Sequence, residues 1–160
     1  MNCVLKAMKR LLITLILSLL SLNTLYAEIS KKSLKEVKRE VKALHTDGWQ
    51  SAIAGTTIEE QAVKVVEYKE AVSSDGTPIY IVVTAEGKSV RDNIAQAMAL
   101  NYCKSKAAQS VHSGDVQVAR SQLGRTIVLM KLKREAGYNV EIRLTCAFKC
   151  SEISAINEQK

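Results

Sequence analysis

The chain has 160 residues, a formal net charge of +7, seven glycines and a single proline. This composition excludes a disordered or collagen-like chain, and the shortage of turn residues argues against a many-stranded β-sandwich. A chain of this length buries enough surface to form one hydrophobic core without disulfide or metal staples.

The first 27 residues have the layout of a secretory signal peptide. Its positive start consists of Lys6, Lys9 and Arg10. An unbroken apolar run follows from Leu11 to Leu20, about half of the ~20 residues that a transmembrane helix needs. We therefore expect cleavage between Ala27 and Glu28, and export to the periplasm, the outer membrane or the medium.

The charge that remains after cleavage limits the partners. The leader holds three of the 23 basic residues and no acidic residue, so the mature chain has a net charge of +4. This mildly basic balance suits an anionic envelope surface and is far below the charge of a nucleic-acid-binding domain. We expect one α/β domain over residues 28–150, a polar tail over 151–160, and no nucleic-acid partner.

The first half of the domain predicts two helices and two strands. A helix over Ser30–His45 carries one apolar stripe, formed by Leu34, Val37, Val41 and Leu44. Gly48 can end it in a left-handed conformation, and a short strand follows over Trp49–Ala54. Thr57 and Glu60 have capping-box spacing at the start of a second helix that runs to Val72.

After a turn at residues 73–76, a strand is predicted over Ile79–Glu86. Both of its sides are fairly apolar, which predicts a place near the centre of a sheet. A long alanine-rich helix follows over Ser89–Val111, with an end at Ser113-Gly114. Its pattern consists of Ile94, Ala95, Met98, Ala99, Tyr102, Cys103 and Ala107. The small residues among them would let the helix approach a sheet closely.

The last third has the clearest strand pattern. Strands over Thr126–Arg134 and Tyr138–Cys150 join at Ala136-Gly137 in a hairpin. The inward residues of the first are Val128, Met130 and Leu132, and those of the second are Val140, Ile142, Leu144, Cys146 and Phe148. The order α-β-α-β-α-β-β predicts an α+β fold, an open-faced two-layer sandwich with all helices on one side of the sheet and the long helix packed on it.

Four stretches resemble a group of small secreted proteins of unknown function common in Bacteroides-like bacteria. The group is distantly similar to the Helicobacter surface-lipoprotein family and to the N-terminal domain of flagellar assembly protein T. The stretches are Asp47 to Trp49, Thr57 to Gln61, Ala95 to Asn101 and Tyr138 to Leu144. The resemblance covers nearly all of Glu28 to Phe148, and implies a compact α/β sandwich in the cell envelope without assigned catalytic residues.

The chain departs from this group in three ways. Relatives carry a longer helical insertion where this chain has Ser110 to Gly124, and they lack its cysteines. The lipoprotein branch has a lipidation cysteine after the apolar run of the leader, whereas Cys3 precedes that run here. We therefore do not expect a lipid anchor.

Three cysteines remain after cleavage, and an oxidising compartment favours a disulfide. Cys146 and Cys150 would lie about 13 Å apart on an extended strand, too far to bridge. We therefore expect a bridge from Cys103 to either Cys146 or Cys150. The alternative is a metal site of thiolates with His45 or His112, although the two histidines suit helix ends better.

The first helix offers the one surface with a candidate partner. Its cations are Lys31, Lys32, Lys35, Lys38, Arg39 and Lys42. They could contact anionic lipid, or the apolar stripe could pair with a second copy of the helix. In the simplest alternative the helix packs on its own sheet with the lysines outward. Trp49 is expected as a core anchor, with stacking on a ligand as the alternative.

No motif predicts a catalytic residue or a cofactor. We therefore expect a non-enzymatic interaction or structural module of the envelope, whose partner is another envelope protein or a second copy. The alternatives are a binder of small apolar ligands, at the open sheet face or beside Trp49, and an enzyme or metal protein that uses Cys146 or Cys150.

The leader gives a first prediction. Intact-mass analysis of the protein recovered after expression of the full chain in a bacterial host should find a chain that begins at Glu28. Replacing Ala27 with a large residue, Ala27→Gln, should leave an uncleaved product, because signal peptidase requires a small side chain there. A wild-type product that begins at the initiator methionine contradicts the prediction.

Overall fold

The computed structural model of the protein describes residues 30–111, 123 and 125–151. The expected leader, His112, the helix end at Ser113-Gly114 and residues 152–160 of the expected tail lie outside the described residues. Among those that are described, no helix is both long and apolar enough to span a membrane.

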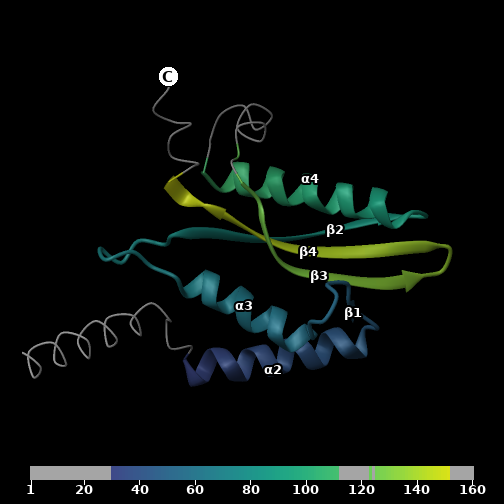
Figure 1. The fold of residues 1–160 in the computed structure, drawn as a ribbon, viewed down its shortest axis with the longest axis horizontal. Coiled ribbons are helices and arrows are strands. Elements are labelled where there is room, and N and C mark those ends of the chain that lie inside the picture. The colour runs from purple at the N-terminus through teal and green to yellow at the C-terminus, as the bar shows by residue number, and fades with distance from the viewer. Residues whose placement is uncertain (1–29, 112–122, 124, 152–160) are drawn as a thin grey trace, which may run out of the picture.

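The described chain forms three helices and a four-stranded antiparallel sheet (Figure 1). The elements are α2 (Lys31–Thr46), β1 (Gln50–Ser51), α3 (Ile58–Glu70), β2 (Tyr80–Ser89), α4 (Asp92–Val111), β3 (Ile127–Ala136) and β4 (Asn139–Lys149). The strands lie in the order β1-β3-β4-β2. The α+β class and the predicted order of elements are confirmed.

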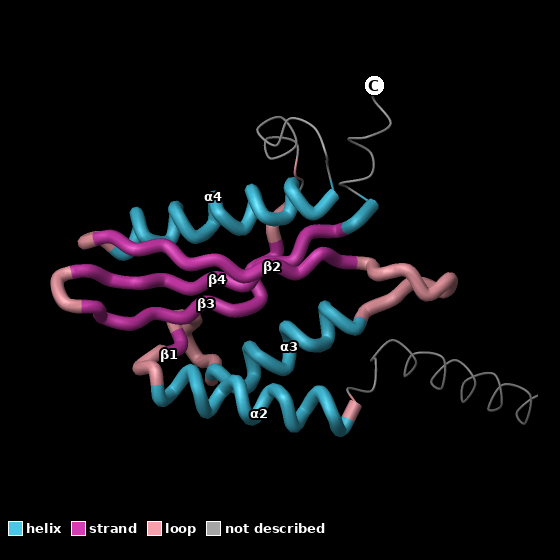
Figure 2. Tube along the Cα trace, turned by 180° about the vertical axis from the view of Figure 1, so that it is seen from behind, coloured by secondary structure: helices cyan, strands magenta, loops and turns pink. Residues whose placement is uncertain are grey.

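The helices cover both faces of the sheet, so the open-faced arrangement with all helices on one side is wrong. Figures 1 and 2 show α4 on one face, and α3 with α2 on the other. Side chains alternate across a strand, and β4 serves both cores: Ile142, Leu144, Cys146 and Phe148 join the α4 core, whereas Ala147 joins the α2–α3 core. The sequence suggested a single core because the residues before Ala147 on that face are polar.

Both ends of α2 follow the sequence signals. Ser30 caps the first turn by accepting a hydrogen bond from the backbone N–H of Ser33 at 3.0 Å. At the other end Gly48 has φ of 79°. The Trp49 N–H donates to the carbonyl of Leu44 at 3.0 Å, and the Gly48 N–H donates to the carbonyl of His45 at 3.1 Å. This is the Schellman arrangement, and it directs the chain back toward the sheet.

The capping box at the start of α3 is also confirmed. The Glu60 N–H donates to the Thr57 hydroxyl at 3.1 Å, and the Thr57 N–H donates to the Glu60 carboxylate at 2.7 Å. The sequence did not indicate that Gln61 would be buried. Its amide nitrogen donates to Ser51 at 2.6 Å and its oxygen accepts from the Lys131 N–H at 2.8 Å, which ties α3 to β1 and β3.

Strand β2 lies at the edge of the sheet, so its predicted place near the centre is wrong. Its two apolar sides have another cause. Ile81 and Val83 pack into the α4 core, whereas Tyr80 and Val82 pack into the α2–α3 core. A strand that is covered on both faces is apolar on both, whether it is central or at an edge.

Helix α4 lies directly on the sheet at Gly87. A Cβ atom at this position would overlap with the backbone oxygen of Ala95 and would lie 2.7 Å from the backbone nitrogen of Ala99. The buried stripe of α4 consists of small residues: Ala95, Ala99, Cys103, Ala107 and Ala108. The predicted close approach is therefore confirmed.

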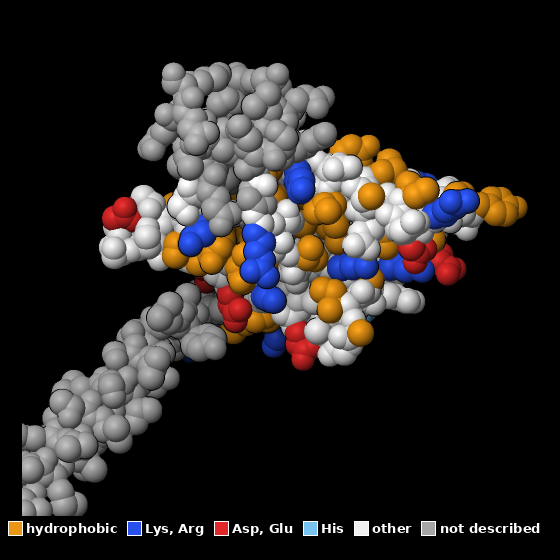
Figure 3. Space-filling view, turned by 45° about the horizontal axis from the view of Figure 1, so that its top comes forward, with side chains coloured by type: hydrophobic (Ala, Val, Ile, Leu, Met, Phe, Trp, Pro, Cys, Tyr) orange, Lys and Arg blue, Asp and Glu red, His pale blue; other side chains and the backbone are white. Residues whose placement is uncertain are grey.

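Two larger apolar residues of α4 lie outside this buried stripe. Ile94 is 42% exposed and Tyr102 is 49% exposed. In Figure 3 apolar side chains are scattered among the cations on the described part of the α4 side. The helix lies so close to the sheet that only its narrow stripe of small side chains is enclosed.

The β3–β4 hairpin is confirmed, but a bulge changes which residues of β3 point inward. Gly137 has φ of 66° in the turn between the paired residues Ala136 and Asn139. Between Val128 and Met130 the register shifts by one residue. As a result Leu129 is buried with Met130, whereas Val128 is 40% exposed, contrary to its predicted inward position.

Gly87 gives a second prediction. Gly87→Ala should lower the free energy of unfolding by about 3 kcal/mol, because the added methyl group forces α4 away from the sheet. The matched control is Gly76→Ala, at φ of 83° with open space around it, which should cost about 1 kcal/mol through backbone strain alone. Urea unfolding measures both. An equal or smaller cost at Gly87 would show that α4 does not need this contact.

Candidate functional site

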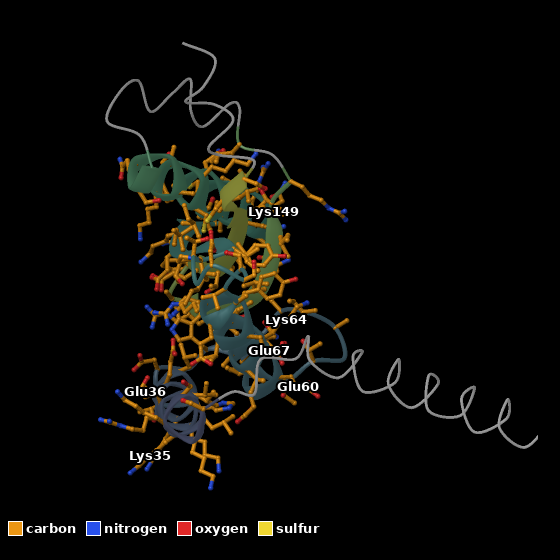
Figure 4. The ribbon with its side chains drawn as sticks, turned by 90° about the vertical axis from the view of Figure 1, so that its left-hand side faces the viewer. Lys35, Glu36, Glu60, Lys64, Glu67 and Lys149 are labelled. Atoms are coloured by element: carbon orange, nitrogen blue, oxygen red, sulfur yellow. The ribbon has the colours of Figure 1, made fainter. Side chains whose placement is uncertain are left out.

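The outward side of α2 carries a dense group of cations, which we call the cationic face. Its members are Lys31, Lys32, Lys35, Lys38, Arg39 and Lys42, and all six side chains are exposed. Figure 4 shows Lys35 pointing away from the body of the protein. The arrangement follows from the helical period, because the apolar stripe that turns inward leaves the remaining positions in solvent.

Ion pairs between described residues do not balance the positive charge of this face. Of the ion pairs between described residues, the one that involves α2 joins His45 and Glu59 at 3.5 Å, and none includes a member of the cationic face. Glu36 and Glu40 lie on the same helix and form none of these pairs either. The face therefore presents six cations against two carboxylates within 16 residues.

Two shallow hollows flank Lys42. One is lined by Arg39, Lys42, Ala43, Thr46 and Asp47, and the other by Lys38, Val41, Lys42, His45, Thr46 and Glu59. Each hollow has at least two basic side chains at its rim. Small anionic groups, such as phosphate or carboxylate, would find several cations within reach there.

The apolar stripe of α2 is already used inside the protein. Val37, Val41 and Leu44 are only 2–4% exposed and pack with α3 and the sheet. Leu34, at 38% exposure, is the exception. The idea that this stripe forms a seam with a second copy of the helix is therefore wrong, and the interpretation with the lysines outward is the one that the fold supports.

Trp49 does not belong to the exposed surface. Its side chain is 1% exposed, and the guanidinium groups of Arg134 and Arg143 lie over the ring at 4.5 and 4.6 Å from its centre. Its Nε1 is a buried atom without a hydrogen-bond partner in the described part of the chain. Trp49 is thus a core anchor, as expected, and an exposed stacking role is excluded.

An ion-pair network surrounds Trp49, and the sequence analysis missed it. Arg134 binds Glu141 at 2.6 Å, Lys88 binds Glu141 at 3.1 Å, and Arg143 binds Glu86 at 2.6 Å. Because Glu141 faces Lys88 and Arg134 on its two neighbouring strands, one carboxylate serves both cations. The signal was present in the alternating polar residues of β4, but their partners could not be assigned before the strand order was known.

The cysteines are poorly placed for nucleophilic chemistry. Cys103 and Cys146 are fully buried where α4 meets the sheet. A hydrogen bond with Cys146 lowers the pKa of Cys103, whereas the same bond and burial raise the pKa of Cys146. Burial also raises the pKa of Cys150, at the end of β4.

No metal centre is formed in the parts that the structure covers. His45 pairs with Glu59 on the surface, away from the cysteines, and His112 lies outside the described residues. Within the described ranges no three His, Cys, Asp or Glu side chains are grouped so that they could hold a metal ion. The hollow nearest Trp49 is lined by Gly48, Gln50, Lys133, Arg134 and Glu135, a polar set.

No protein-family model, curated protein or solved structure matches this chain. The resemblance to small secreted envelope proteins therefore stays a prediction. What bears on function is therefore the arrangement of the described residues, above all the cationic face.

The network around Trp49 gives a third prediction, on pH. Hydrogen bonds from Arg134 and Lys88 hold the pKa of Glu141 below its ordinary value of 4.5. The stability that this carboxylate contributes is therefore present above pH 4.5 and is lost as the pH falls through its lowered folded-state pKa. Glu141→Gln should lower the free energy of unfolding by about 1 kcal/mol near pH 7, and this deficit should shrink in acid.

Urea unfolding of both proteins at several pH values measures this difference. Glu40→Gln is the matched control, because it removes the same charge from an exposed carboxylate that forms no ion pair with a described residue, and so measures the effect of net charge alone. If the loss in unfolding free energy caused by Glu141→Gln stays constant through the acid range, the negative charge of Glu141 does not stabilise the fold through Arg134 and Lys88.

Proposed function

We propose that this protein is an exported, non-enzymatic docking module of the bacterial envelope that binds anionic membrane surfaces through the cationic face of α2. The observation that carries the proposal is that six exposed cations gather on one helix and none of them pairs with a carboxylate of a described residue. The signal peptide and the final location in the envelope belong to the same proposal.

The energetics favour weak and reversible binding. Each cation close to an anionic lipid surface contributes about 1 kcal/mol, and the attraction decays over a Debye length of about 10 Å at moderate salt. The face has no exposed aromatic anchor, and the apolar stripe beneath it is buried in the core. Binding should therefore be electrostatic and sensitive to salt. The axis of α2 should lie parallel to the membrane plane.

The position of α2 in the chain supports the same assignment. Helix α2 begins at Lys31, close behind the proposed cleavage site at Ala27. A chain released there would have its cationic helix at the start of the mature protein, on the opposite side of the sheet from α4. Docking through α2 would leave the α4 side available to another envelope protein.

This proposal gives a fourth prediction. The exported protein should sediment with vesicles of phosphatidylglycerol and phosphatidylcholine, and not with vesicles of phosphatidylcholine alone. The quadruple variant Lys35→Gln, Lys38→Gln, Arg39→Gln, Lys42→Gln should bind at least about tenfold more weakly, because it loses most of the cations at the surface. Binding of the wild type should also fall as salt is raised.

The matched control neutralises three lysines and one arginine elsewhere: Lys64→Gln, Lys69→Gln, Arg125→Gln, Lys149→Gln. These side chains are exposed and form no ion pair with a described residue. Lys64 and Lys149 lie on the body of the protein away from α2 in Figure 4. Equal losses for the two quadruple variants would show a response to net charge alone, and absence of vesicle binding by the wild type would overturn the proposal.

A further inference from the structure

Two thiols meet in the core between α4 and the sheet. Cys103 lies in the buried stripe of α4, and Cys146 lies on the α4 side of the central strand β4. Both residues are 0% exposed and carry free thiols in the structure. Such a pair of cysteines on two facing elements is a candidate for covalent modification.

The contacts of Cys103 bring the two side chains together. Its thiol donates to the carbonyl oxygen of Leu144 at 3.5 Å and lies 3.8 Å from that of Val83. It therefore lies over the boundary between β2 and β4, beside Val83, which is the register partner of Cys146, and both cysteines belong to the same core. A bridge between them would join two elements that already pack against each other.

Cys150 is in a different position. It follows the end of β4, is partly exposed and does not belong to the core that contains the other two cysteines. Its backbone N–H donates to the carbonyl of Ile79 at 2.9 Å, beyond the start of β2. The sequence left Cys146 and Cys150 as alternative partners of Cys103, and the fold favours Cys146.

We propose that Cys103 and Cys146 form an intramolecular disulfide that fixes α4 to the central strand of the sheet. The inference rests on the proposed function in one respect, because export supplies the oxidising compartment in which the bond persists. Once formed, the disulfide needs no partner protein to persist.

The chemistry is thiol–disulfide exchange with a disulfide oxidant, either a dithiol oxidoreductase or oxidised glutathione. The Cys103 thiolate attacks one sulfur of the oxidant, whose S–S bond breaks and releases a thiolate, so that a mixed disulfide forms. The Cys146 thiolate then attacks the Cys103 sulfur and releases the second thiol of the oxidant. The two cysteines lose two protons and two electrons in total, and the oxidant disulfide is reduced to two thiols.

Burial determines when this exchange can occur. An oxidant cannot reach thiols that are 0% exposed, so the mixed disulfide forms before α4 has packed against the sheet. Closure of α4 then brings Cys146 to the Cys103 sulfur. The finished bond restricts the unfolded chain between residues 103 and 146, so it stabilises the folded protein.

The experiment refolds the denatured, reduced full chain in a glutathione redox buffer and maps its disulfides by digestion and mass spectrometry. We expect a linked pair of peptides that contain Cys103 and Cys146. Reduction should lower the Tm by about 10 °C. Cys103→Ala and Cys146→Ala should each abolish the link and the response of the Tm to reductant, whereas Cys150→Ser should retain both.

The variants are expected to fold. Cys103→Ala extends the stripe of Ala95, Ala99 and Ala107, and Cys146→Ala removes one sulfur atom from the opposite side of the same contact. A refolded protein in which Cys103 and Cys146 remain thiols, or in which Cys150 takes either place, overturns the inference. Because the chain is oxidised after purification, the link can form even if export or vesicle binding fails, so the two proposals fall separately.

Discussion

The structure depends on strand β4 being packed on both faces. It pairs with β2 along one edge and with β3 along the other, and its side chains alternate between the α4 core and the α2–α3 core. Each helix layer is therefore held by a different set of residues of the same strand. The outward orientation of the cationic face follows from this, because α2 must turn its apolar stripe toward the core that it shares with the sheet.

The two faces of the sheet are built differently. On the α4 side small residues allow close contact, with Gly87 beneath Ala95 and Ala99. On the other side, one part of the sheet carries apolar residues that pack with α2 and α3. Another part carries the charged side chains around Trp49. The ring of Trp49 packs against Arg134 and Arg143 there. Each of these partly buried cations keeps a carboxylate partner, which offsets the cost of burying its charge.

The proposed activity and the proposed disulfide use opposite sides of the protein. The cationic face lies on the outer side of α2, whereas Cys103 and Cys146 lie beneath α4. One side would contact the envelope electrostatically, and the other would be fixed covalently in an oxidising compartment. Neither depends on a catalytic group.

The sequence by itself determined the features that depend on neighbouring residues. These are the stop of α2 at Gly48, the capping box of Thr57 and Glu60, the hairpin at Gly137 and the cations of α2, because turn chemistry and helical periodicity act over a few residues. The tertiary structure alone decided the rest. Strand order placed β2 at an edge and gave Glu141 its two cations. The packing of α4 on the sheet brought Cys103 and Cys146 into one core, a pairing that the sequence left open. These contacts join residues far apart in the chain, and local patterns carry no information about which elements become neighbours.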